Sequence, residues 1–298
     1  MSKNLSAAAS KQFDTEVKHA YQALTARLAG TTTERKGVVG NEYDFRKMGK
    51  GLATQRTAPS SDAVPMNVDH ALVTCTLTDW EANEYTDIFN SKEVNFDEVR
   101  ELASTIAGAL GRRDDQLKID AMDGGTYSTT PVQGTSGGQV AVAVGGADTN
   151  MNIDKLRAAA KFLDDNEVPE MGRHIVATPS QKAALLAQTQ VTSTDYANVK
   201  ALVNGEIDTF LGFKFHWIGK RDEGGLTIDG NNVRSCYAWH ESAIGYANGM
   251  DMTTNVDWIA HKKSWLSAGN LKAGAVIRDI DGIVEILCDE DDDDGAAA

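Results

Sequence analysis

The sequence predicts an α+β fold, and three observations support this class. Residues 95–125 have the pattern of one unusually long helix, whereas residues 70–80 (HALVTCTLTDW) are rich in the β-branched residues typical of a strand. In the second half of the chain, expected helices and strands follow one another without strict alternation. A doubly wound sheet would require that alternation, so a mixed sheet organised around a long helix is predicted.

The long helix has a clear start, stripe and end. Asn95 is a good N-cap, and Glu98 can complete a capping box with it. The pair Gly124-Gly125 ends the pattern, which gives roughly 39 Å of helix at 1.5 Å per residue. Apolar residues at helical spacing predict one buried stripe: Val99, Leu102, Ile106, Leu110, Leu117 and Ala121.

The two segments before this helix are predicted to extend from the compact part of the protein. Residues 5–29 form an amphipathic pattern that ends at Gly30, and a Thr-rich linker follows. Residues 35–89 predict a long β-hairpin with its tip near residues 59–65. Two-stranded ribbons are marginal in water, so we expect both segments to lie against a partner surface in this subunit or another.

A second compact region is expected after a Gly-rich stretch at 123–150. Asn152 is predicted to cap a helix, and Thr178-Pro179-Ser180-Gln181 is a strong helix start. The expected helices cover 153–163, the segment from 179 through 186, 196–203 and 240–248. The expected strands cover 139–144, 173–177, 213–218, 235–239, 255–259, 265–268, 275–279 and 283–287.

Charge and composition exclude several classes of protein. The net charge of −14 argues against a dedicated nucleic-acid binder, and no apolar run reaches the roughly 18–20 residues of a membrane span. The first 60 residues carry ten Lys and Arg against five Asp and Glu, or +5, so the remainder carries −19. This asymmetry suits an N-terminal arm that lies on an acidic neighbour, although an uneven surface explains it equally well. The three cysteines are expected to be buried thiols.

No catalytic, cofactor-binding or metal-binding residue can be assigned, and no cofactor is expected. The sequence has no CxxC pair, no closely spaced histidines, no phosphate-binding loop and no Gly-x-Ser-x-Gly turn. The acidic run at 289–294 lacks the glutamate that would complete a calcium loop. The five tryptophans are expected to be core and interface anchors. We therefore expect a structural protein rather than an enzyme.

The order of elements resembles the major capsid proteins of tailed bacteriophages, the Hong Kong 97-type fold. Residues 173–186 (RHIVATPSQKAALL) and 202–219 (LVNGEIDTFLGFKFHWIG) are similar to the axial-domain pattern, with its G-x-I-x-x-x-x-G-F turn into a strand. Residues 236–249 (CYAWHESAIGYANG) resemble the return into the peripheral domain, and residues 271–287 resemble the terminal strands.

This resemblance implies a domain plan and a function. The implied parts are an N-terminal arm (1–34), an extended hairpin loop (35–90), a peripheral domain (91–150 and 233–288), an axial domain (151–232) and an acidic disordered tail (289–298). The resemblance further implies that the chain assembles with itself into hexamers and pentamers of an icosahedral shell. That shell would enclose double-stranded DNA, which it would hold without sequence-specific binding.

The resemblance also implies partners and a location. Scaffolding and portal proteins, and in some phages decoration proteins, would join the shell in the host bacterial cytoplasm, with no membrane involved.

We expect the cluster at residues 112–115 to face solvent, the shell interior or an adjoining subunit, and Gly108 and Gly111 to mark close packing. Two alternatives stay open: an encapsulin-type nanocompartment shell with the same fold, and a soluble α+β enzyme.

Overall fold

The computed structural model describes residues 25–60, 62–89, 98–187, 209–221 and 223–291. Most of the expected helix at 5–29, the capping box at Asn95, the expected helix at 196–203 and the end of the acidic run lie outside these residues. The chain divides into two compact units. Unit 1 comprises Met1–Ala26, Asp79–Arg112 and Met252–Leu271, and unit 2 comprises Arg27–Thr78, Arg113–Asp251 and Lys272–Ala298.

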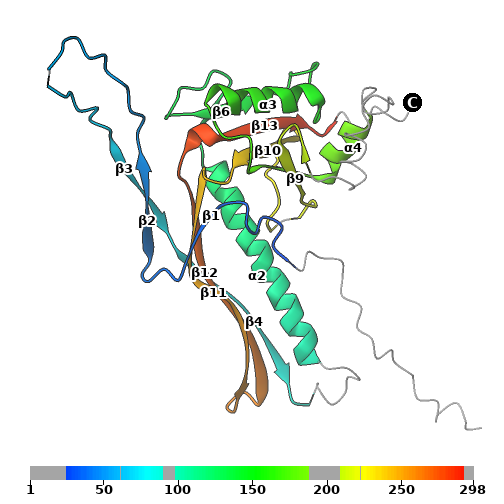
Figure 1. The fold of residues 1–298 in the computed structure, drawn as a ribbon. Helices are drawn as coiled ribbons and strands as arrows, with labels where there is room; N and C mark the ends of the chain where they lie inside the picture. Colours follow the sequence, from blue (N-terminus) through cyan, green and yellow to red (C-terminus); the bar gives the residue numbers. More distant parts are fainter. Residues whose placement is uncertain (1–24, 61, 90–97, 188–208, 222, 292–298) are drawn as a thin grey trace, which may run out of the picture. The chain divides into compact units, whose positions relative to one another are not determined.

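Unit 2 is built on a mixed seven-stranded sheet with the order β5-β6-β13-β10-β7-β9-β8 (Figure 1). Its central strands pair in antiparallel fashion, β10 with both β13 and β7, whereas β6 and β9 add parallel partners on either side. This mixture confirms the α+β prediction. The strands are β5 (Tyr127–Ser128), β6 (Gly137–Val140), β7 (Arg173–Ala177), β8 (Thr209–Phe210), β9 (Phe213–Trp217), β10 (Val233–His240) and β13 (Ile283–Asp289).

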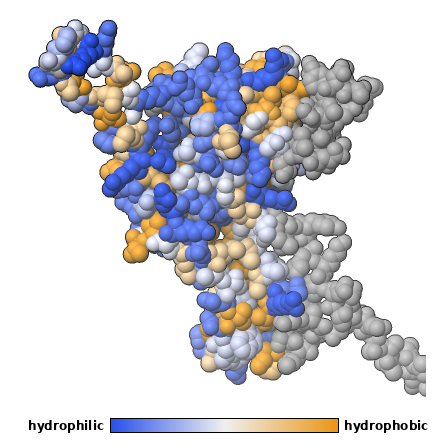
Figure 2. Space-filling view, in the orientation of Figure 1, coloured by the Kyte–Doolittle hydropathy of each residue, from blue (hydrophilic) through white to orange (hydrophobic). Residues whose placement is uncertain are grey.

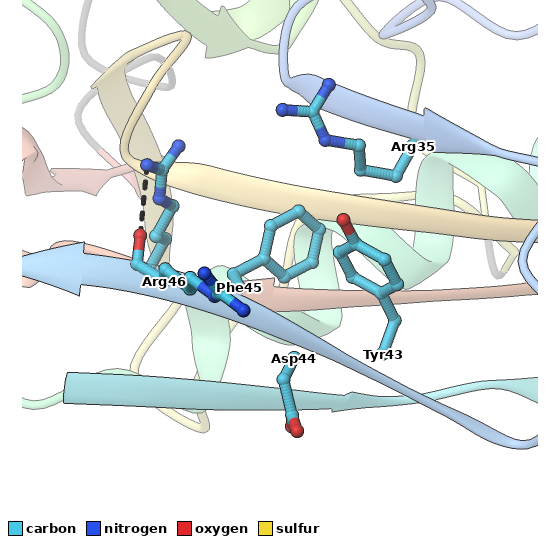
Figure 3. A pocket seen from close by; sticks show the side chains of 6 residues that line it. Arg35, Tyr43, Asp44, Phe45 and Arg46 are labelled. Carbon is cyan, nitrogen blue, oxygen red and sulfur yellow. Dashed lines mark hydrogen bonds between the residues drawn. The ribbon is translucent and has the colours of Figure 1, made fainter.

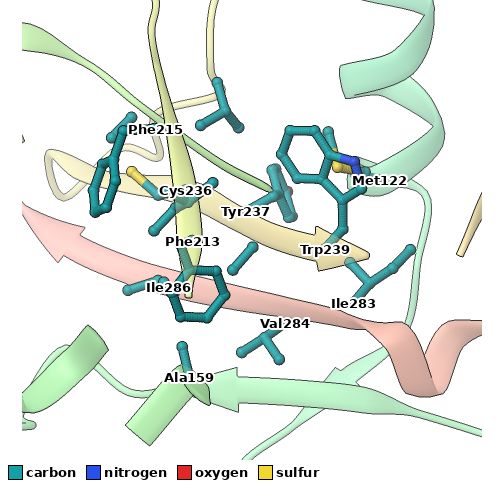
Figure 4. Packing of buried hydrophobic residues seen from close by; sticks show 14 of the residues in the cluster. Met122, Ala159, Phe213, Phe215, Cys236, Tyr237, Trp239, Ile283, Val284 and Ile286 are labelled. Atoms are coloured by element: carbon teal, nitrogen blue, oxygen red, sulfur yellow. The ribbon is translucent and has the colours of Figure 1, made fainter. Parts of the chain in front are cut away.

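Helices cover both faces of this sheet. Figure 4 shows Ala159 of α3 (Ile153–Asp165) on one side of β13, and Met122 of α2 (Glu98–Asp123) beside Trp239 on the other. Trp239 is fully buried, and its indole Nε1 donates to the carbonyl oxygen of Thr31 at 2.9 Å. The buried apolar side chains between the helices and the sheet form one large cluster. Their burial is the main stabilising contribution in unit 2, at about 25 cal/mol per Å² of apolar surface.

Two predicted helix starts are confirmed in atomic detail. The Asn152 side chain accepts a hydrogen bond from the amide of Lys155 at 2.7 Å, which caps α3. Helix α4 begins at Pro179 and extends to Ala187, and the side chain of Gln181 accepts from the Thr178 amide at 3.1 Å. These contacts satisfy backbone donors that the helix itself leaves unpaired.

The predicted hairpin is confirmed as β2 (Glu42–Met48) paired antiparallel with β3 (His70–Thr76). Beside it, β1 (Thr33–Lys36) pairs in parallel with β11 (Ile244–Ile259). Strand β4 (Thr78–Asp87) is the last strand of a four-stranded sheet and lies next to β12 (Ser264–Ile277). Residues 79–87 of β4 belong to unit 1. A short 3₁₀ helix, η3 (Ile280–Gly282), leads into β13.

The expected helix at 240–248 is wrong, because this segment contains a turn and the start of β11. Residues 245–248 align with residues 33–36 of β1, which lies more than 200 positions earlier. Such a distant backbone partner overrides the local helix preference of the Glu and Ala residues in this stretch. The expected strands at 265–268 and 275–279 are largely parts of one 14-residue strand, β12. The expected strand at 139–144 begins earlier and ends at Val140, where a turn follows.

The long helix is confirmed, but its buried stripe differs from the prediction, since Val99 and Leu102 are only partly buried. Ile106 and Leu110 are buried in unit 1 as predicted. In unit 2, Leu117 and Ala121 are only partly buried, whereas the helix buries Asp115, Lys118, Ile119 and Met122. A pattern of apolar residues at helical spacing misses this face, because two of its four buried residues, Asp115 and Lys118, are charged.

Candidate assembly surfaces

The base of the hairpin is fixed to unit 2 by a small apolar cluster and an ion pair. Phe45, Cys75, Leu77 and Ala247 form the buried cluster. A side chain at Gly245 would lie only 2.7 Å from the Phe45 ring, so glycine is needed for this close approach. Lys47 donates to Asp279 at 2.9 Å. The hairpin base is therefore firmly placed in unit 2.

The distal hairpin has almost no core of its own. Beyond the hydrogen bond from the Gly49 amide to the Asp69 carbonyl, nearly every described residue from 50 to 69 is exposed. Leu52 is 81% exposed and Val64 is 68% exposed. Figure 2 shows apolar patches beside strongly hydrophilic ones on the surface of the protein. Exposed apolar side chains gathered on one protruding element are typical of a protein interface.

Unit 1 also exposes aromatic side chains. The rings of Trp258 and Trp265 pack edge to face with centroids 5.2 Å apart, yet the residues remain 41% and 39% exposed. The ammonium nitrogen of Lys262 lies 3.8 Å from the ring centroid of Tyr85, which is on β4. Tryptophan and tyrosine are enriched at protein interfaces, so these exposed side chains of unit 1 are further candidate contact residues.

Charged groups on α2 hold the chain where it enters unit 2. Asp115 is fully buried and accepts hydrogen bonds from the amides of Arg27 (3.0 Å) and Leu28 (2.8 Å). The same carboxylate pairs with Arg221 at 2.7 Å, and the Lys118 ammonium donates to the Leu28 carbonyl at 3.2 Å. The sequence-based expectation that residues 112–115 face solvent, the shell interior or an adjoining subunit is therefore wrong for Asp115, which is buried inside unit 2. Asp115 fixes the point from which the preceding residues leave unit 2.

The close packing predicted at Gly111 is confirmed. In unit 1, a side chain at this position would lie 3.1 Å from the Ala26 nitrogen and 3.3 Å from the Thr25 carbonyl carbon. The backbone of the N-terminal segment therefore packs directly on the helix at this glycine.

A second buried carboxylate lies at the start of the acidic run. Glu290 accepts from Arg234 at 2.6 Å, from Lys220 at 2.8 Å and from Gln181 at 3.2 Å. Burial alone would raise the pKa of Glu290, but these hydrogen bonds outweigh it and lower the pKa to about 2. Asp289 is the last residue of β13. The first two acidic residues of the expected tail are thus part of the folded unit.

The described residues show no arrangement that resembles an enzyme site. Within them, no group of three or more His, Cys, Asp or Glu could hold a metal ion. All three cysteines are free and buried, as predicted. No helix in the described part of the chain is long and apolar enough to cross a membrane. His174 and His216 lie 3.1 Å apart between their ring nitrogens, but His174 packs against Trp239 in the core.

Comparison with known proteins decides the family. The sequence profile of a family described as phage capsid protein matches residues 5–290. The chain belongs to this phage capsid protein family. No match was found among curated proteins.

Solved capsid structures share the fold of this capsid protein at low sequence identity. The head of Helicobacter pylori bacteriophage KHP40 matches with a TM-score of 0.74 and 10% identity, covering 95% of this chain and 96% of that chain. The capsid of cyanophage P-SCSP1u matches with a TM-score of 0.70 and 18% identity, covering 96% and 94%. The capsid of Ralstonia phage GP4 matches with a TM-score of 0.69 and 11% identity, covering 94% and 95%.

The chain is a phage major capsid protein with the Hong Kong 97-type fold, as the resemblance implied. Its role is structural, in the virion capsid, where it assembles with copies of itself. The functional features are therefore contact surfaces rather than a catalytic centre. Sequence reasoning located the hairpin but missed the buried carboxylates, since a charged residue inside a helix carries no signal of the distant partners that bury it.

Proposed function

We propose that this capsid protein forms hexamers and pentamers that close an icosahedral shell around the double-stranded DNA of a tailed phage. The observation that carries the proposal is the hairpin: a fixed base in unit 2 and about twenty exposed residues beyond it, several of them apolar. Such a loop gains stability only by burying its apolar surface on another subunit.

The domain plan expected from the sequence supports this proposal. We assign residues 1–34 and 35–90 to the arm and hairpin, 91–150 with 233–288 to the peripheral domain, and 151–232 to the axial domain. In this plan the arm and hairpin contact neighbouring subunits. The axial domains meet around the axis of each capsomer. Residues 289–298 are the acidic tail, whose first residues pack in unit 2.

The proposed partners follow from the same function. Scaffolding and portal proteins would guide closure of the shell in the bacterial cytoplasm, and a decoration protein could stabilise its surface. With a net charge of −14, the shell would hold packaged DNA only loosely and without sequence preference. The encapsulin alternative uses the same fold, but the match to a phage capsid family favours the virus.

Electron microscopy of the purified protein tests this function. Expressed alone or with a scaffolding protein, it is expected to form capsomers or closed shells of uniform size. Protein that stayed monomeric under all these conditions would contradict the proposal. Uniform small shells that co-purify with an enzyme cargo would instead indicate a nanocompartment.

A further inference from the structure

Three arginines are among the residues that line an open cavity in unit 2, between the hairpin base and the strands beside it. The cavity has a volume of about 420 Å³. Figure 3 shows Arg35 on β1 and the aromatic rings of Tyr43 and Phe45 on β2 around the same space. The complete lining is Arg35, Tyr43, Asp44, Phe45, Arg46 and Arg278.

The charges of this cavity are not balanced within the described chain. Its one carboxylate, Asp44, accepts a hydrogen bond from the hydroxyl of Thr74 at 2.7 Å. No ion pair of Arg35, Arg46 or Arg278 occurs among the residues that the structure describes. The adjacent Lys47, by contrast, is paired with Asp279.

This arrangement has the chemistry of a carboxylate receptor. The guanidinium group is planar, stays charged at all relevant pH values and binds carboxylates through two parallel hydrogen bonds. Like charges that line one cavity repel each other, and an anion bound there reduces that repulsion. Arg278 is held in place, because its Nη2 donates to the Arg46 carbonyl at 3.2 Å. The rings of Tyr43 and Phe45, with centroids 4.9 Å apart, form a rigid wall.

We propose that this arginine cavity binds an acidic segment of a second copy of the chain. The argument for this occupant is charge complementarity. Residues 1–60 carry +5, whereas the remaining residues carry −19, so a neighbouring copy offers mainly carboxylates. The inference rests on the proposed assembly of the capsid protein and adds to it a specific contact that orients the hairpin base against its neighbour.

Removal of the arginines tests whether the cavity acts in assembly. Arg35→Gln and Arg46→Gln are expected to raise the protein concentration needed for assembly roughly tenfold or more, the usual effect of losing a charged hydrogen bond. Both side chains are exposed, so the variants should unfold at the same denaturant concentration as the wild type. Arg157→Gln is the matched control, because Arg157 is an exposed arginine on α3 that pairs with Asp154.

A zero-length crosslink identifies the occupant. Arg46→Lys keeps the charge and introduces an amine, which a carbodiimide couples only to a carboxylate in contact with it. In assembled mixtures of ¹⁴N- and ¹⁵N-labelled subunits, mass spectrometry should find residue 46 joined to an Asp or Glu of the other copy. The existing pair Lys47–Asp279 should give a crosslink within one chain, which serves as the internal standard.

The outcomes separate this inference from the proposed function. Wild-type protein that forms no capsomers or shells would overturn both. Wild-type shells with equal assembly of the arginine variants, or crosslinks from residue 46 only within its own chain, would overturn this inference alone. Variant shells that assemble normally but retain less DNA would show that the cavity binds phosphate, which also overturns it.

Discussion

At the scale of single residues, the strongest interactions come from carboxylates buried among donors. Asp115 accepts two backbone amides and an arginine, and Glu290 accepts two cationic side chains and an amide. A buried charge is costly unless it is paired and hydrogen-bonded, and both groups meet that condition. Removing one partner from such a pair leaves the buried charge of the other without compensation. Substitutions of these carboxylates should therefore change the free energy of unfolding measurably.

We expect Asp115→Asn to destabilise unit 2 by about 3 kcal/mol, because Arg221 loses its charged partner and the amides of Arg27 and Leu28 lose a strong acceptor. Denaturant unfolding of the unassembled protein measures this change. Asp120→Asn on the same helix is the control, since Asp120 is exposed, and it should have little effect. Equal stability of the two variants would show that Asp115 does not fix the entering chain.

The lowered pKa of Glu290 predicts how stability depends on pH. The pKa is about 2 in the folded protein against an ordinary value of 4.5. The ionised group therefore stabilises the fold fully above about pH 4.5, and this contribution is lost as the pH falls toward 2. Glu290→Gln should lower the free energy of unfolding at neutral pH.

The same variant should lose less additional stability than the wild type between about pH 4.5 and 2. Unfolding curves at a series of pH values measure the difference. The exposed residue Glu170 supplies the control, as Glu170→Gln should follow the wild-type curve. Parallel curves for wild type and Glu290→Gln would refute the role given to this ion pair.

At the scale of elements, close backbone approaches hold the hairpin base. A side chain at Gly274 of β12 would overlap the carbonyl oxygen of Thr76, at the end of β3. Gly274→Ala therefore forces the strands apart, and we expect a loss of about 2 kcal/mol with faster proteolysis of the hairpin. Gly230→Ala is the control, because nothing lies within 4 Å of its added methyl group. If proteolysis were unchanged in Gly274→Ala, the hairpin would be held by other contacts.

How much the sequence predicts at this scale depends on whether the signal is local. The caps at Asn152 and Thr178 and the hairpin pairing are set by neighbouring residues, and all were predicted. The start of β11 was not, because its partner β1 is distant in sequence. The arginine cavity was missed for the same reason, since its residues come from β1, β2 and the segment after β12.

At the scale of the whole molecule, the boundary between the two compact units falls within the N-terminal segment, at Arg27. From there the chain is part of unit 2: Leu28 is fully buried, and β1 extends from Thr33 to Lys36. An arm that contacts neighbouring subunits would therefore leave unit 2 before Arg27. This refines the boundary at residue 34 that the resemblance implied, and two truncations can separate the folding role of the segment from its assembly role.

Removal of residues 1–24 should leave folding stability close to that of the wild type but reduce the yield of closed shells, because the arm's contact area on neighbours is lost. Removal of residues 1–34 should also destabilise unit 2, by about 2–5 kcal/mol for the loss of Leu28 alone. Denaturant unfolding and electron microscopy of both proteins measure the two effects. Normal shells from the shorter truncation would show that the arm does not clamp neighbours. Equal stability of the two truncations would show that residues 25–34 do not contribute to the fold, contrary to the buried position of Leu28 and the hydrogen bond from Trp239 to Thr31.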